Sequence, residues 1–234
     1  MTRRLILLRH GQTTYNATGR MQGQLDTELS EEGRRQARRA AEFFVRMKDS
    51  PELRISRILA SDLTRARTTA EIIAAQLGLP VATDARLRET YLGEWQSRRT
   101  ADVDVEQPGA RAIWRHDATW APPGGESRVE VGRRACPVIE ELMESYEEWD
   151  GSAVLVVAHG GTISALTSRL LGWPVEHYPL LSGLRNTSWS QLAARPVFDP
   201  QNPNAPVSFR EARAATGVMP EAQWYLDAWN AGVI

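Results

Sequence analysis

The 234-residue sequence contains one cysteine, Cys136, and one lysine, Lys48. A single cysteine excludes an intrachain disulfide and zinc sites built on paired cysteines. This is consistent with a reducing compartment, so we expect a cytoplasmic protein. Because lysine is nearly absent, almost all positive charge is carried by arginine, which binds phosphate through two parallel hydrogen bonds and stays charged.

Long apolar runs and an excess of charge of one sign are also missing. The apolar run 5–8 is too short for a signal peptide, and no other run approaches a membrane span. The formal net charge of −1 gives no general attraction to nucleic acid or membrane surfaces. We therefore expect a small phosphorylated metabolite as partner, and neither nucleic acid nor membrane. The sequence leaves a homodimer open.

Short apolar runs alternate with amphipathic segments along most of the chain. Strands are predicted at 5–8, 55–60, 81–83, 154–157, 187–194 and 224–229. Helices are predicted over 30–46, 63–77, 127–149 and 162–171. Pro137 lies inside the third of these helices and is expected to kink or break it. The alternation predicts an α/β fold of three layers, α/β/α, with a mainly parallel central sheet.

Two segments interrupt this alternation. The segment 94–126 has little periodicity and contains three tryptophans, so we expect an irregular or helical insertion that caps the site. The segment 195–220 is rich in proline and lacks periodicity, which predicts a long loop. The length of the chain suits a single domain, 1–234, that includes both segments.

Polar residues follow three of the predicted strands at the point where each strand ends. They are Arg9 and His10 after the first strand, Arg65 after the second, and His159 after the fourth. In open α/β sheets, ligands bind outside the carboxyl ends of the strands, so these residues converge on one pocket if the strands are neighbours. Both histidines lie between an apolar run and a glycine, although the chain has only four histidines.

Such a pocket suits phosphoryl transfer. Arginines bind phosphate oxygens, a neutral imidazole can attack phosphorus, and a second, protonated histidine would stabilise the transferring group. Glycine beside the nucleophile lets backbone N–H groups approach an oxyanion. Glu89 is the candidate proton donor, although an ordinary surface carboxylate remains an alternative. No cluster with metal-ligand spacing is visible, so we expect arginine charge to replace a metal, and no cofactor.

An ordered set of motifs resembles a known family. The motifs are Leu8-Arg9-His10-Gly11-Gln12-Thr13, Asn16, Gln22-Gly23, Ser61-Asp62-Leu63-x-Arg65-Ala66, Arg88-Glu89 and Ala158-His159-Gly160. In this order they resemble the histidine phosphatase superfamily, in its phosphoglycerate-mutase-like branch. The resemblance implies phosphate transfer to His10 in a pocket formed with Arg9, Arg65 and His159, and Glu89 as proton donor. It also implies contacts to the phosphate or substrate from Asn16, Gln22, Gly23 and Gly160.

Further stretches resemble a narrower group of that family, which acts on a glucosylated phosphoglycerate. These stretches are 21–29, 108–111, 117–122, 124–128 and 226–230. The resemblance implies a metal-independent phosphomonoesterase for a small phosphorylated sugar acid. The chain departs from the phosphatases of this branch at Ser97, where glycine is common, and in the length of segment 195–220.

Other activities remain open. They are a phosphoglycerate mutase, an α-ribazole phosphatase, a broad-specificity acid phosphatase, a phosphatase of a phosphorylated protein and a catalytically silent phosphate-ester-binding protein. Mutases of this branch usually carry a basic segment directly after the catalytic glutamate. Glu89 is instead followed by the acidic and apolar segment 90–95, which favours a phosphatase.

Several site residues also have a structural alternative. Trp114 and Trp120 form either a wall against which a sugar stacks or part of a local core. Asn16 and Gln22 are also typical of turns. Glu126, Ser127 and Arg128 either contact substrate or belong to the start of a helix capped by Ser127.

Overall fold

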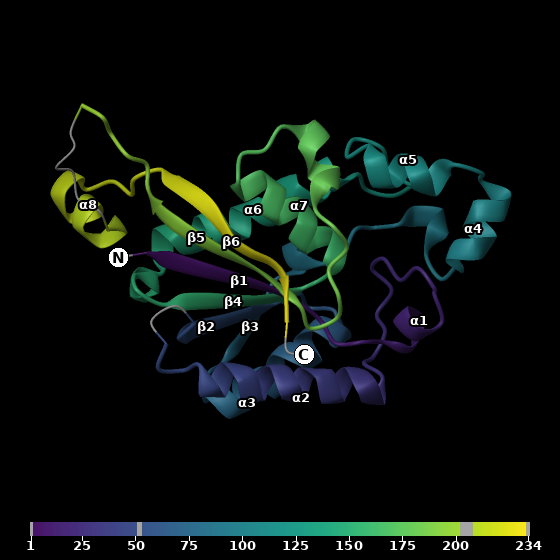
Figure 1. Ribbon diagram of the computed structural model, residues 1–234, viewed down its shortest axis with the longest axis horizontal. Helices are drawn as coiled ribbons and strands as arrows, with labels where there is room; N and C mark the ends of the chain where they lie inside the picture. Colours follow the sequence, from purple (N-terminus) through teal and green to yellow (C-terminus); the bar gives the residue numbers. More distant parts are fainter. Residues whose placement is uncertain (1, 51–52, 202–207, 233–234) are drawn as a thin grey trace.

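The computed structural model describes residues 2–50, 53–201 and 208–232, which form a six-stranded sheet between helices (Figure 1). The strands are β1 (Arg3–Arg9), β2 (Ile55–Ala60), β3 (Val81–Thr83), β4 (Ala153–Ala158), β5 (Trp189–Pro196) and β6 (Ala222–Ala231). Their order across the sheet is β3-β2-β4-β1-β5-β6. Strands β1 to β4 run parallel to one another, whereas β5 and β6 are antiparallel to their neighbours. The predicted α/β fold with a mainly parallel sheet is confirmed.

Helices cover both faces of this sheet. The helices α2 (Glu31–Arg46) and α3 (Thr64–Leu77) lie on one face, and α6 (Arg128–Ser145) and α7 (Gly160–Leu170) lie on the other (Figure 1). Alternate side chains of β1 enter the two cores, Leu5 and Leu7 on the α6 and α7 side, Ile6 and Leu8 on the other. Each such fully buried side chain contributes roughly 1.5–3 kcal/mol. Burial on both faces explains why β1 is apolar without alternation.

The ends of the main helices follow from their sequences. The hydroxyl of Ser30 accepts a hydrogen bond from Gly33 N–H at the start of α2. Ser127 and Glu130 form a capping box at the start of α6. Gly78 ends α3 in a left-handed conformation with a φ of 68°, which costs glycine little. The predicted boundaries of α2 and α3 are confirmed to within a residue or two.

The helix predicted over 127–149 differs from the observed α6 in two respects. The helix continues through Pro137 without a break, and it ends at Ser145 before a separate 3-10 turn at Glu147–Trp149. Val138 and Ile139 next to the proline are buried in the core. Their burial, with that of the rest of this helix face, offsets the cost of roughly 3 kcal/mol of an internal proline.

Segment 94–126 is more ordered than expected. It contains α4 (Thr100–Glu106) and α5 (Ala110–His116), which lie with α1 (Thr14–Ala17) beyond the carboxyl ends of the parallel strands (Figure 1). Trp95 and Val103 pack with Met21 and Leu92 in a small core separate from the two main ones. This segment, which we call the cap, is therefore held by apolar contacts among its own residues and with Met21 and Leu92.

The prediction of a long loop at 195–220 is wrong. Strand β5 extends to Pro196, and α8 (Phe209–Thr216) begins at Ser208, whose hydroxyl accepts a hydrogen bond from Glu211 N–H. Residues 202–207 of that segment lie outside the described residues. Phe209 is fully buried in the core on the α6 and α7 side of the sheet. This contact fixes α8 at the end of the molecule opposite the cap (Figure 1).

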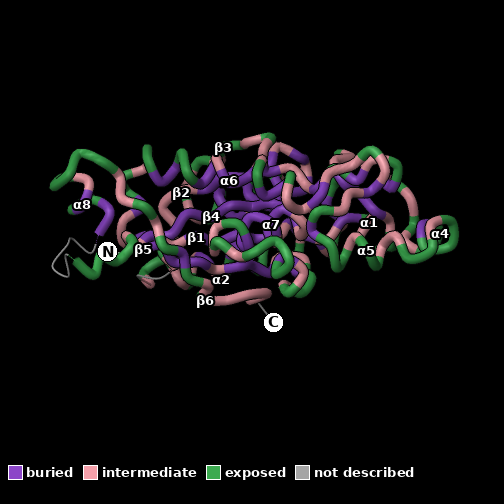
Figure 2. Tube along the Cα trace, turned by 90° about the horizontal axis from the view of Figure 1, so that it is seen from above, coloured by how far each residue is buried: buried purple, intermediate pink, exposed green. Residues whose placement is uncertain are grey.

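The remaining elements are short 3-10 helices. They are η1 (Ala85–Leu87), η2 (Gly93–Trp95), η3 (Glu147–Trp149) and η4 (Val175–Leu180). Figure 2 shows that buried positions follow the sheet and the helix sides that face it, whereas α4 is largely exposed. In the described part of the chain no helix combines the length and apolar character needed to cross a bilayer.

Candidate active site

The topology brings the predicted residues to one edge of the sheet. Strands β1 and β4 are parallel neighbours, with Arg9 beside Ala158, so His10 and His159 follow at the same level. Their ring centroids are 5.1 Å apart in an edge-to-face arrangement. Strand β2 pairs with the other side of β4, and α3 after it carries Arg65 in its first turn. The expectation that these strands are neighbours is confirmed.

A cavity of about 200 Å³ lies at this edge. Predicted site residues that line it are Arg9, His10, Asn16, Gln22, Gly23, Arg65, Glu89 and Trp114. Residues that sequence analysis did not identify complete the wall: Arg20, Met21, Thr90, Leu92 and Gly161. His159 is fully buried next to His10 and does not line the cavity, and Gly160 and Trp120 also lie outside it.

His10 is held as a neutral imidazole with a defined orientation. Its Nδ1 lies 2.7 Å from the carbonyl oxygen of Gly11, so Nδ1 carries the proton and donates it. Burial lowers the pKa of His10 well below its usual value, and the charges of Arg65 and Arg9 lower it further. Nε2 therefore keeps a free lone pair, which is the form that can attack phosphorus.

Backbone carbonyls orient the two arginines, and no carboxylate of the described residues pairs with either. Arg65 donates from Nη1 to Leu25 O and from Nη2 to Gly23 O, both at 2.7 Å. Burial lowers its pKa to about 10, so it remains charged at neutral pH. Arg9 donates to the carbonyl of Leu184, and burial lowers its pKa as well. Within the described residues the buried Nε atoms of both have no partner, which suits an anion in the cavity.

His159 is neutral in the unliganded protein. Burial lowers its pKa well below the usual value, and the charges of Arg65 and Arg9 lower it further. Neither ring nitrogen has a hydrogen-bond partner among the described residues. The protonated His159 expected from the sequence therefore requires a bound anion, because a phosphate dianion opposes the repulsion from the arginines.

Glu89 lies at the start of α7, where it takes the place of a helix cap. Its carboxylate accepts hydrogen bonds from Thr162 N–H at 3.1 Å, Gly161 N–H at 3.3 Å and Thr90 N–H at 2.8 Å. The helix has no side-chain cap of its own at His159. The positive end of α7 and these amides fix the carboxylate at the cavity wall.

A hydrogen-bond network orients Gln22. The hydroxyl of Thr13 accepts from Asn16 N–H at 3.1 Å and donates to Gln22 Oε1 at 2.9 Å. Thr27 donates its hydroxyl to the same Gln22 oxygen. Because Oε1 is occupied twice, the NH₂ group of Gln22 is left to donate to a ligand in the cavity.

Asn186 is a further residue that sequence analysis missed. Its side-chain amide donates to the carbonyl of His10 at 2.9 Å and to Asn16 Oδ1 at 3.3 Å. The next residue, Thr187, has a φ of 52°, a strained value for a β-branched side chain, and its N–H donates to Arg9 O. Asn186 therefore ties the nucleophile loop to the residues before β5.

The glycine after His10 has a role other than the one expected. Gly11 N–H donates to the Thr69 hydroxyl at 3.1 Å and is not free to bind an oxyanion. A Cβ on Gly11 would lie 2.4 Å from the carbonyl oxygen of Gly33, so glycine there allows close packing against α2. A Cβ on Gly160 would meet only Arg9, at 3.7 Å or more, which is ordinary contact.

Gly23 is required by its backbone. Its φ of 55° is left-handed, and a Cβ there would lie 2.4 Å from Gln96 Oε1. Its carbonyl accepts the hydrogen bond from Arg65 described above. The Gln22-Gly23 turn therefore positions both a donor to the cavity and the phosphate-binding arginine.

The two tryptophans predicted as a substrate wall differ in placement. Trp114 lines the cavity and packs edge-to-face on Trp95, with ring centroids 5.9 Å apart. Trp120 packs on Trp95 at 5.5 Å and belongs to the small core of the cap. Only Trp114 is in a position to contact a ligand.

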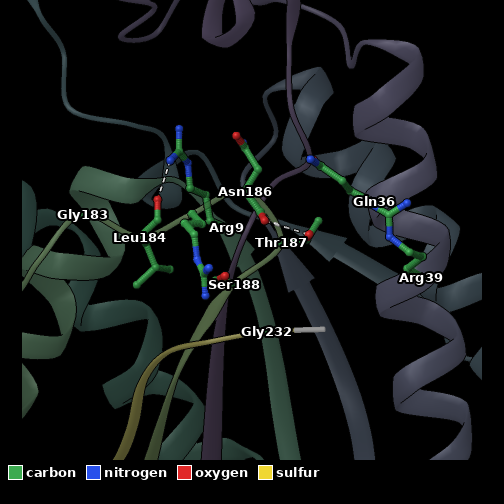
Figure 3. A pocket seen from close by; sticks show the side chains of 10 residues that line it. Arg9, Gln36, Arg39, Gly183, Leu184, Asn186, Thr187, Ser188 and Gly232 are labelled. Atoms are coloured by element: carbon green, nitrogen blue, oxygen red, sulfur yellow. Dashed lines mark hydrogen bonds between the residues drawn. The ribbon is translucent and has the colours of Figure 1, made fainter. Parts of the chain in front are cut away.

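Arg9 also lines a larger cavity, of about 570 Å³ (Figure 3). Figure 3 shows Arg9 and Asn186 opposite Gln36 and Arg39 of α2. In the described part of the chain, neither a histidine nor an acidic side chain lines this cavity, so it lacks a nucleophile and a proton donor. We therefore locate the chemistry in the smaller cavity.

Comparisons with known proteins agree with this geometry. The family model for the histidine phosphatase superfamily (branch 1) matches residues 5–197. The glucosyl-3-phosphoglycerate phosphatase of Mycolicibacterium vanbaalenii is 48% identical over 98% of this chain and 95% of its own. That of Mycobacterium tuberculosis is 49% identical with the same coverage. A solved mycobacterial glucosyl-3-phosphoglycerate phosphatase in complex with VO3 has a TM-score of 0.83 at 46% identity, covering 98% of this chain and 100% of that one.

Proposed function

We propose that this chain, which belongs to the histidine phosphatase superfamily and is a phosphatase, hydrolyses glucosyl-3-phosphoglycerate. In this proposal His10 carries the phosphate between the two steps of the reaction. The observation that carries the mechanism is the neutral, oriented His10 in one cavity with Arg9, Arg65 and Glu89. The near full-length similarity to phosphatases of that name supports the substrate. We also propose that it acts in the cytoplasm.

In the first step, His10 Nε2 attacks phosphorus and the bond from phosphorus to the ester oxygen breaks. Arg9 and Arg65 neutralise the phosphoryl oxygens, and His159 donates to them once the bound anion favours its protonated form. Gln22 donates its NH₂ group to the substrate. Glu89, in its protonated form, gives a proton to the departing alcohol oxygen.

In the second step, Glu89 is a carboxylate and takes a proton from water. The water oxygen attacks phosphorus, the phosphorus–nitrogen bond breaks, and His10 returns to its neutral form with inorganic phosphate released. Arginine and histidine supply the positive charge in both steps. Among the described residues there is no group of three or more His, Cys, Asp or Glu that could hold a metal ion. Activity without a metal stays a prediction, tested by measuring phosphate release in EDTA.

The residues after Glu89 support hydrolysis in preference to mutase activity. Thr90 and Leu92 line the cavity, and Glu94 lies on the exposed surface, so this segment adds no cation to the site. A mutase has to hold a second anionic group of its intermediate while it excludes water. Release of free phosphate from 3-phosphoglycerate, without formation of 2-phosphoglycerate, distinguishes the two activities.

The first test of the mechanism is His10→Ala. We expect kcat to fall by about 10⁴-fold or more, because the covalent carrier is lost. His10 lies just beyond β1, so the melting temperature should stay close to that of the wild type. Rapid quenching at alkaline pH, followed by mass spectrometry, should find phosphate on His10 in the wild type. Turnover that survives the substitution would remove the covalent mechanism.

The substrate is tested separately, with a panel in the presence of EDTA. It contains glucosyl-3-phosphoglycerate, mannosyl-3-phosphoglycerate, 3-phosphoglycerate, α-ribazole phosphate and p-nitrophenyl phosphate. We expect kcat/KM to favour the glucosylated ester by about 10³-fold, which is ~4 kcal/mol of transition-state discrimination. Slow and uniform release across the panel would retain the phosphatase chemistry and reject this substrate.

A further inference from the structure

A third cavity, of about 470 Å³ and distinct from the one in Figure 3, adjoins the active-site cavity. The two share Arg9, Glu89, Thr90, Trp114 and Gly161. Because the two cavities share these lining residues, the part of a ligand that extends from a phosphate at His10 would lie close to this space. We call it the side cavity.

The side cavity is basic. Arg115 and His116 from the end of α5 and Arg128 from the start of α6 line it in addition to Arg9. Among the described residues, Glu89 is its only acidic lining residue, and the amides of α7 already hold its carboxylate. The side cavity therefore favours a second negative charge on the ligand.

Arg128 is a half-buried cation without a counter-charge. Among the described residues no carboxylate forms an ion pair with it, and its guanidinium donates only to the carbonyl of Arg115, at 3.1 Å. Burial alone lowers its pKa, which is the expected effect on a cation that lacks an acidic neighbour. By contrast, Arg134 on the same helix pairs with Glu126 at 2.9 Å.

The position of Arg128 in α6 is also unfavourable to helix stability. It is the first residue of the helix, directly after the N-cap Ser127. A cation at a helix N-terminus is repelled by the helix dipole and by the free N–H groups there. Helix formation therefore does not explain an arginine at 128. The face of Trp114, 5.9 Å from its guanidinium carbon, holds the side chain toward the site.

We propose that Arg128 binds the carboxylate of a phosphorylated sugar acid whose phosphate lies at His10, and so selects substrates with that second anion. The proposal rests on the proposed function of the active-site cavity. An arginine fork matches a carboxylate geometrically, and a cation left unpaired by an uncharged analogue makes that analogue a poor substrate. The helix dipole of α6 favours the same anion.

The test compares two substrates that differ in the carboxylate. 3-Phosphoglycerate carries it, whereas glycerol 3-phosphate has the same terminal phosphate without it. We expect the wild type to prefer 3-phosphoglycerate in kcat/KM. In Arg128→Gln the ratio of the two kcat/KM values should fall by about 10- to 100-fold, as for a lost charged hydrogen bond. Arg128→Lys should recover part of the ratio, because it restores the charge without the fork.

The matched control is Arg133→Gln. Arg133 is exposed on the same helix and lines neither cavity, so its loss removes one positive charge at a distance. In this variant the ratio of the two kcat/KM values should stay within about twofold of the wild-type ratio, because exposed charges are screened by salt. The melting temperature of Arg128→Gln should equal or exceed that of the wild type, because an unfavourable charge is removed from the helix N-terminus.

Two results would overturn the proposal: a wild-type enzyme that does not distinguish the two substrates, or an Arg128→Gln ratio equal to that of the control. Neither result depends on glucosyl-3-phosphoglycerate. A wild type that fails to prefer that ester can still favour 3-phosphoglycerate over glycerol 3-phosphate as expected. In that case the proposed substrate is wrong and the carboxylate site stands.

Discussion

Glu89 and Gly161 lie so close together that no side chain fits between them. A Cβ at position 161 would lie 2.6 Å from both Glu89 Oε1 and Thr90 Oγ1. Gly161→Ala must therefore displace the carboxylate from the amides that hold it. We expect kcat to fall by about 100-fold, within the range that general acid–base catalysis contributes. Steady-state kinetics with a phosphate monoester of an aliphatic alcohol measures the loss, because a poor leaving group needs the proton.

The comparison for this prediction is Gly160→Ala at the neighbouring position. A Cβ there has only ordinary contacts, the nearest being Arg9 Nε at 3.7 Å. We expect kcat to fall by at most about fivefold, which corresponds to ~1 kcal/mol in the activation free energy. Equal losses in the two variants would mean that the start of α7, and not the position of Glu89, limits the reaction.

Individual site residues were predictable where they follow a buried strand. Apolar runs locate the strands, and His10 and His159 are the first residues after two of them. Asn186 could not be found this way, because it precedes an antiparallel strand and acts through the His10 carbonyl. The role of Gly11 was misjudged, since the sequence does not reveal that α2 packs 2.4 Å from where its Cβ would lie.

At the scale of elements, α8 was missed although its sequence contains both boundary residues. Ser208 and Glu211 have capping-box spacing, and Gly217 ends the helix with a φ of 75°. The prolines before Ser208 dominated the interpretation. The failure at Pro137 has a different cause: its buried neighbours Val138 and Ile139 supply stability that local propensity does not report.

Helix α8 gives a prediction about stability. Ser208→Ala removes the hydroxyl that accepts from Glu211 N–H at 3.2 Å and should lower the free energy of unfolding by about 1 kcal/mol. Urea denaturation followed by circular dichroism measures the change. Ser145→Ala, at the exposed end of α6, should stay within ~0.5 kcal/mol. Catalytic activity should be unaffected, because α8 lies at the end opposite the cap.

At the scale of the whole molecule, the two histidines link the active site to folding. Both are buried among arginines, in a chain whose formal net charge is only −1. The folded state keeps both neutral well below the usual pKa of about 6.5, whereas the unfolded state protonates them near that value. Below pH 6.5 the unfolded chain therefore binds more protons than the folded one, and stability is lost as the pH falls.

This linkage gives a quantitative expectation. Between pH 7.5 and 5.5, each histidine that stays neutral in the folded state should lower the free energy of unfolding by about 1.3 kcal/mol. The variant His159→Gln keeps a polar side chain of similar reach. Over this interval its free energy of unfolding should therefore fall by about 1.3 kcal/mol less than that of the wild type. Urea denaturation at the two pH values measures both. Because phosphate favours protonated His159, saturating phosphate should reduce the difference between the two proteins. An equal loss in wild type and variant without phosphate would mean that His159 is not held neutral by its burial beside the arginines.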